Sequence, residues 1–149
     1  MKAEELMIGD LVQFACFDKS TITVKVTAIG NNIDGDSDTG SHWCNIKNVL
    51  PIPLTDEILE ANGFEKKGAN FGIFDDYFDF ELHEYNDGTW LVTYHCCEMS
   101  LSDEQVLIFH VHQLQHFMRH CGIEKVLDLN PELLEQREPN DARINLAES

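Results

Sequence analysis

The alternation of apolar and polar side chains in the first fifty positions predicts antiparallel strands. Residues 11–17 form a β-rich run, residues 21–28 alternate strictly, and the polar residues 18–20 between them are typical of a hairpin turn. A polar loop is expected over residues 34–41, followed by a third strand over residues 42–47. Short strands joined in this way predict a curled N-terminal sheet of the SH3-like type with one solvated face.

A short helix is expected after this sheet. Pro51 and Pro53 favour an extended segment, and Thr55 then suits the N-cap of a helix whose first turn is acidic. The pair Asn62 and Gly63 provides a C-terminal stop, because glycine accepts the left-handed conformation of a helix cap. Residues 51–70 are therefore predicted to be an ordered connector.

The second half of the chain predicts a hairpin and a longer helix. Alternating residues 78–83 and 90–96 flank a strong turn signal at residues 86–88. An apolar run over residues 106–109 then precedes a helical stripe, which consists of Val111, Leu114, Met118 and Cys121 and is closed by Gly122.

Together these elements predict an α+β fold. We expect a single domain over residues 1–129, built from the SH3-like sheet (1–50), the connector helix (51–70) and the hairpin plus helix (71–129). Residues 130–149 show no sustained pattern and are expected to be a flexible tail.

The net charge of the chain limits the kinds of molecule that it is expected to bind. The 149 residues include 27 Asp and Glu but only 10 Lys and Arg, which gives a net charge of −17. Direct binding to nucleic acid or to an anionic membrane is disfavoured, because both need clustered basic side chains. The five cysteines are odd in number and irregularly spaced, and no signal peptide or membrane span is recognisable. We therefore expect reduced thiols and a cytoplasmic protein.

The histidines near the C-terminal end are weak candidates for a metal site. His112, His116 and His120 are spaced by four residues, which places them along one side of a helix. The HExxH pattern and the paired CxxC spacings that identify zinc sites are absent from the sequence. No metal or other cofactor is expected, and a metal-binding protein or metal-dependent enzyme that uses the cluster from His110 to His120 is the alternative.

No catalytic residues are predicted. The segment that begins at Asp34 has the carboxylate spacing of a calcium loop, but Thr39 and Asn45 stand where that loop needs Gly and Glu. The neighbours His95 and Cys96 would point to opposite faces of a strand, so they do not form a nucleophile and base pair. Whether the chain is an enzyme is left open, and this pattern favours a non-enzymatic protein.

A row of carboxylates gives a second alternative. It consists of Asp75, Asp76, Asp79, Glu81 and Glu84. Spaced negative charges can imitate the phosphates of nucleic acid and bind a basic host protein, although an acidic solvated surface is the simpler interpretation.

Three stretches resemble a known family. They are Glu-Leu-Met-Ile-Gly-Asp-Leu-Val at residues 5–12, Pro-Ile-Pro-Leu-Thr-Asp-Glu-Ile-Leu at 51–59 with Gly-Phe-Glu-Lys at 63–66, and Val-His-Gln-Leu-Gln at 111–115. Their order and spacing are similar to those of small uncharacterised proteins carried by prophages and other mobile elements of Bacteroides-type bacteria. The resemblance implies context and no activity.

The function predicted from these observations is that of a non-enzymatic accessory protein of a phage or mobile element, acting through protein contacts. The partner is expected to be a host or phage protein, and the oligomeric state is left open. The aromatic residues that form the candidate interaction surface are Trp43, Tyr77, Phe78, Trp90 and Tyr94.

Overall fold

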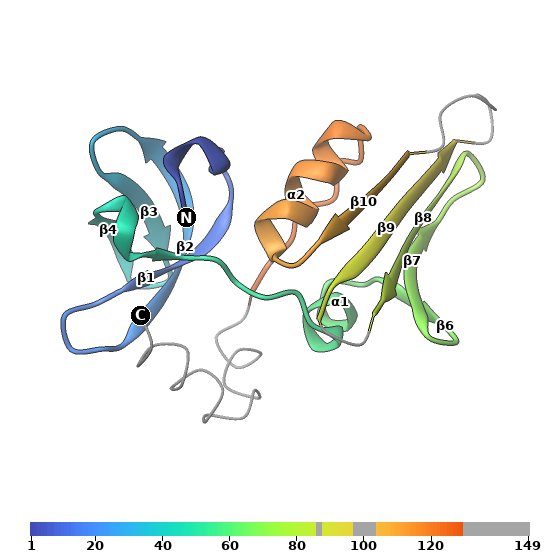
Figure 1. The fold of residues 1–149 in the computed structure, drawn as a ribbon, viewed down its shortest axis with the longest axis horizontal. Coiled ribbons are helices and arrows are strands. Elements are labelled where there is room, and N and C mark those ends of the chain that lie inside the picture. The colour runs from blue at the N-terminus through green and yellow to red at the C-terminus, as the bar shows by residue number, and fades with distance from the viewer. Residues whose placement is uncertain (86–87, 97–103, 130–149) are drawn as a thin grey trace. The chain divides into compact units, whose positions relative to one another are not determined.

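The computed structural model describes residues 1–85, 88–96 and 104–129, and its chain forms two compact units (Figure 1). Of the described residues, unit 1 contains Met1–Ile52 with Asp128 and Leu129, and unit 2 contains those between Pro53 and Leu127. The described part of each unit is built on one antiparallel sheet of five strands, and the helices α1 and α2 belong to unit 2. The predicted α+β class is confirmed. Cooperative folding of residues 1–129 as a single domain stays a prediction, and the expected tail at 130–149 lies outside the described residues.

The sheet of unit 1 has the strand order β4-β3-β2-β1-β5. Its elements are the 3-10 turns η1 (Ala3–Glu5) and η2 (Ile46–Asn48) and the strands β1 (Leu11–Ala15), β2 (Thr21–Ile29), β3 (Ile33–Ser37), β4 (Gly40–Cys44) and β5 (Val49–Leu50). β5 pairs with β1 through only two residues, and β4 pairs with β3. The described strands therefore form an open, uncurled sheet with β4 and β5 at its edges. The predicted SH3-like curling into a barrel is corrected, because no pairing joins these two edges.

The acidic segment expected to be a loop contains strand β3. Ile33 and Gly35 are buried while Asp34 and Asp36 are exposed, so the strand alternates despite its polar composition. A Cβ atom added to Gly35 would lie 2.8 Å from Cγ2 of Val24. Glycine is thus needed here for the close approach of β3 to β2. Because glycine adds no apolar side chain to the alternation, the hydrophobic pattern did not predict this strand.

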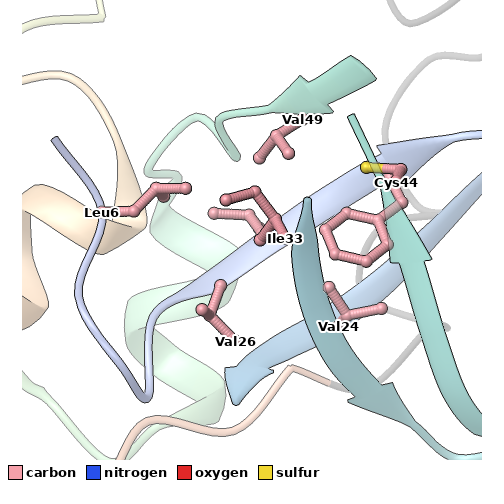
Figure 2. Packing of buried hydrophobic residues seen from close by; sticks show 8 residues of the cluster. Leu6, Val24, Val26, Ile33, Cys44 and Val49 are labelled. Carbon is pink, nitrogen blue, oxygen red and sulfur yellow. The ribbon is translucent and has the colours of Figure 1, made fainter. Parts of the chain in front are cut away.

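The core of unit 1 lies on one face of this sheet. Figure 2 shows it, and its buried residues are Leu6, Val12, Phe14, Val24, Val26, Ile33, Cys44 and Val49. The chain enters β1 through a tight turn in which the amide of Asp10 donates to the carbonyl of Met7 over 3.1 Å. Gly9 takes a φ of 95° in this turn, which favours glycine, and the fully buried Asp10 accepts a hydrogen bond from the amide of Met7.

Unit 2 has the strand order β10-β9-β8-β7-β6. Its elements are the helices α1 (Asp56–Ala61) and α2 (Val111–His120) and the strands β6 (Glu65–Lys67), β7 (Asn70–Phe74), β8 (Phe78–Glu84), β9 (Trp90–Cys96) and β10 (Glu104–Ile108). The register of β8 and β9 runs from Phe78 opposite Cys96 to Glu84 opposite Trp90. The hairpin predicted from the alternation is confirmed.

The predicted ends of both helices are also confirmed. Oγ1 of Thr55 accepts a hydrogen bond from the amide of Ile58 over 3.3 Å, as an N-cap side chain does. Gly63 and Gly122 follow the two helices with φ of 79° and 77°, the left-handed conformation expected of a C-terminal cap.

Helix α2 covers one face of the sheet of unit 2 (Figure 1). Val111, Leu114 and Met118 are buried, and the ring of Phe117 lies 5.9 Å from the ring of Phe80, measured between centroids. We call the face of Phe80 the inner face and the opposite face the outer face. No described helix packs on the outer face, and no described helix is long and apolar enough to cross a membrane.

Candidate interaction surface

The five aromatic residues selected from the sequence do not form one surface. Trp43 lies on β4 of unit 1 and is 70% exposed, whereas the other four belong to unit 2. Tyr77 is 63% exposed in the connection between β7 and β8. Phe78 and Tyr94 are half-buried on the inner face, with ring centroids 5.8 Å apart. Burial, with a smaller effect of the nearby Cys96, raises the pKa of Tyr94.

Trp90 has a structural role. It is 0% exposed, and its indole Nε1 donates a hydrogen bond to the backbone carbonyl of Leu54 over 3.1 Å. Its ring meets that of Phe71 edge to face at 6.1 Å. Trp90 therefore anchors the segment before α1 to the inner face, and it is not part of an exposed surface.

The histidines of α2 differ in their surroundings. His112 is buried, with its ring centroid 5.6 Å from that of His116 and 5.8 Å from that of His110. His120 is exposed, and its Nε2 lies 2.9 Å from Oε2 of Glu104. Within residues 1–85, 88–96 and 104–129, no group of three or more His, Cys, Asp or Glu side chains is arranged to hold a metal ion. The metal-binding alternative stays a prediction from the sequence.

Two cysteine thiols are held in their protonated form. Burial raises the pKa of Cys44 to about 11, and the neighbouring Cys16 adds to the shift. Burial also raises the pKa of Cys121 to about 11, with a further contribution from the carboxylate of Glu104. Because the thiolate is the nucleophile, these surroundings oppose thiol chemistry at either residue.

The carboxylates proposed as a row lie on different faces. Asp79 and Glu81 point to the outer face, since they alternate along β8 with the buried Phe80. Glu84 falls on the inner face, where burial raises its pKa and the charges of Asp56 and Glu57 add to that effect. Only part of the predicted row is thus available as one surface.

The outer face carries an apolar surface that the sequence did not reveal. The amide of Tyr85 donates to the carbonyl of Thr89 over 2.8 Å, which continues the register of β8 and β9. The register of β9 and β10, continued by one residue, places Phe109 on the other side of Thr89. Tyr85 is 46% and Phe109 is 48% exposed, while Thr89 between them is only 7% exposed. Thr89 is therefore buried on a face that no described helix covers.

A second row completes this surface. His83 is opposite Leu91 on β9, and Leu91 is opposite Leu107 on β10. Leu107 is 54% exposed, and Leu91 is half-buried. The ring of His83 meets that of Tyr85 edge to face at 5.6 Å. We call these two neighbouring rows the outer-face patch, which consists of His83, Tyr85, Thr89, Leu91, Leu107 and Phe109.

One signal in the sequence could have identified this patch. The run from Val106 to Phe109 has no polar residue, and a continuous apolar run is typical of a strand that is apolar on both faces. Val106 and Ile108 point to the inner face, so Leu107 and Phe109 must point outward. Such a strand therefore leaves apolar side chains exposed on the face that no described helix covers.

On β7, away from the outer-face patch, an aromatic ring packs over a glycine of the outer face. A Cβ atom added to Gly72 would lie 2.7 Å from Cζ of Phe74, so the ring of Phe74 lies across Gly72. The ammonium of Lys67 lies 3.7 Å from the centroid of that ring. The ring of Phe74 and the charged end of Lys67 thus lie together on the outer face of β7.

Comparisons of the chain with protein-family models, with curated proteins and with solved structures found no match.

Proposed function

We propose that the protein is a non-enzymatic binding protein that contacts another protein through the outer-face patch. The observation that carries this proposal is the exposure of Tyr85, Leu107 and Phe109, at 46%, 54% and 48%, in two neighbouring rows of a face that no described helix covers. Single exposed apolar residues are common on protein surfaces, whereas contiguous ones mark sites of contact. Aromatic residues are also enriched at the centres of protein interfaces.

The context of this contact follows from the sequence. The resemblance to proteins of Bacteroides-type prophages and mobile elements supports an accessory role and a host or phage protein as the partner. The net charge of −17 supports a protein partner over nucleic acid. The odd number of cysteines supports the cytoplasm as the compartment.

Affinity capture with paired variants tests the proposal. The wild-type protein, a Tyr85→Gln and Leu107→Gln double variant, and a control with Trp43→Gln and Tyr77→Gln are each used to capture proteins from lysate of a Bacteroides-type host. The control removes two aromatic side chains that are at least as exposed, at 70% and 63%, and that lie outside the patch.

We expect a stoichiometric partner that is retained by the wild-type protein and the control and lost with the patch variant. Loss with the control variant and retention by the patch variant would contradict the proposal. Circular dichroism of all three proteins checks that each is folded.

A further inference from the structure

The outer face has an acidic end next to its apolar end. Along β8, the outward side chains run from Tyr85 and His83 in the patch to Glu81 and then Asp79. Six residues of strand separate Tyr85 from Asp79, which corresponds to about 20 Å at about 3.3 Å per residue. Asp75 and Asp76 are exposed in the connection from β7 to β8, next to Asp79 at the start of β8. Along β8, the outer face therefore changes from apolar at Tyr85 to negatively charged at Asp79.

The acidic end keeps a negative balance beside the neighbouring strands. Lys67 of β6 lies on this face over the ring of Phe74 and keeps its positive charge, but Glu65 of β6, which pairs with Gly72, lies on the same face and offsets that charge. Lys66 lies with its ammonium 5.4 Å from the centroid of Phe71, a residue of the inner face. Neither Asp79 nor Glu81 forms an ion pair with another residue in the described part of the chain. Their charges are left to attract a cationic partner.

The shape of this surface favours a helix. An added β-strand uses the hydrogen-bonding edge of a sheet, whereas this surface lies on the side chains of three adjacent strands, β8, β9 and β10. An amphipathic helix can lay one apolar stripe on such a face. A span of about 20 Å corresponds to about 14 residues of α-helix at about 1.5 Å per residue.

From this geometry we infer that the segment bound by the outer face is a basic amphipathic α-helix of the partner protein. Its apolar side chains pack on Tyr85, Leu107 and Phe109, and its Lys or Arg side chains lie over Glu81 and Asp79. The inference rests on the proposed function, since it uses the same patch and adds the chemistry of the partner. Opposite charge beside the apolar contact sets the orientation of the helix and speeds association.

The test uses three synthetic 18-residue peptides with the full-length protein. The first is a helix of Leu and Lys with an apolar stripe, the second replaces Lys with Glu, and the third replaces Leu with Ser and so keeps only the positive charge. Fluorescence anisotropy measures affinity, and chemical-shift changes in NMR spectra locate the contact. The variants are Leu107→Gln, the pair Asp79→Asn with Glu81→Gln, and a control pair, Asp34→Asn with Asp38→Asn, which removes the same charge from unit 1.

We expect the Leu and Lys peptide alone to bind tightly, with shift changes at the patch and affinity falling as salt rises. Leu107→Gln and the Asp79 and Glu81 pair should each weaken binding about tenfold, and the control pair should change it less than about twofold. Failure of this peptide to bind, equal binding by the Glu or Ser peptide, or shifts outside the patch would overturn the inference.

Two outcomes separate this inference from the proposed function. If lysate capture still depends on Tyr85 and Leu107 while the Leu and Lys peptide fails, the patch is the binding surface and the helix is the wrong partner. If the protein forms a concentration-dependent dimer that Leu107→Gln abolishes, the occupant is a second copy of the chain and the inference is overturned.

Discussion

Trp43 and Trp90 are identical side chains in opposite environments. Trp43 is 70% exposed on the edge strand β4, whereas Trp90 is fully buried and donates to the carbonyl of Leu54. Both lie in segments predicted to be strands, so the strand prediction alone could not separate them. The packing of α2 on the face of the sheet that carries Trp90 could not be predicted from the sequence.

This contrast predicts different costs for the same substitution. Trp90→Phe removes a buried hydrogen bond and leaves the Leu54 carbonyl without that donor, so we expect a loss of about 1–3 kcal/mol of stability in urea denaturation. Trp43→Phe should change stability by less than about 0.5 kcal/mol. Equal effects of the two substitutions would contradict the structural role of Trp90.

The two raised thiol pKa values predict slow labelling. A shift from 9.0 to about 11 lowers the thiolate fraction near pH 8, so Cys44 and Cys121 should react about 100-fold more slowly in the native protein than in urea. The measurement uses variants that keep only one of these cysteines, with a chromogenic thiol reagent. Equal rates in native and denatured protein would show that these thiols are not shielded.

The sign of the pH dependence of stability follows from the same shifts. The unfolded thiols ionise from about pH 9 upward, while the folded thiols stay protonated until about pH 11. The folded state therefore binds more protons in this window, and its stability falls as pH rises from 9 to 11. Single Cys44→Ala and Cys121→Ala variants should each show a smaller fall in the urea midpoint over this window than the wild type.

At the scale of elements, the sequence predicted the features that depend on a few neighbouring residues. The cap at Thr55, the stop at Gly63 and the register of the hairpin over residues 78–96 each depend on a few neighbouring residues, and each is confirmed. The strands β3, β6 and β7 were not predicted, because they are polar or contain glycine and are defined by pairing with other strands. The outer-face patch was missed for the same reason, since it is assembled from three strands.

A glycine in β7 tests the packing of that sheet. A Cβ atom on Gly72 would lie 2.6 Å from the carbonyl oxygen of Phe80 and 2.7 Å from the ring of Phe74. Gly72→Ala should therefore destabilise the protein by about 1–3 kcal/mol in urea denaturation. Gly30→Ala is the control, because its Cβ would meet nothing closer than 4.0 Å. A neutral Gly72→Ala would mean that β7 and β8 are spaced differently.

At the scale of the whole molecule, the two tryptophans report on the two units separately. A protein with Trp43→Phe retains Trp90 in unit 2, and one with Trp90→Phe retains Trp43 in unit 1. If residues 1–129 fold as the single domain predicted from the sequence, fluorescence and circular dichroism should give coincident urea transitions in each variant. A midpoint reported by the tryptophan that differs from the midpoint for the whole chain would contradict a single domain.

The central claim is that the outer-face patch binds a protein partner. Hydrogen–deuterium exchange of the full chain, alone and with the captured partner, tests it most directly, because exchange reports on each strand without any substitution. We predict slower exchange over β10 and over the ends of β8 and β9 at Tyr85 and Leu91, with no change at β4. Protection centred on β4 and Trp43, with exchange of β10 unaltered, would contradict the account.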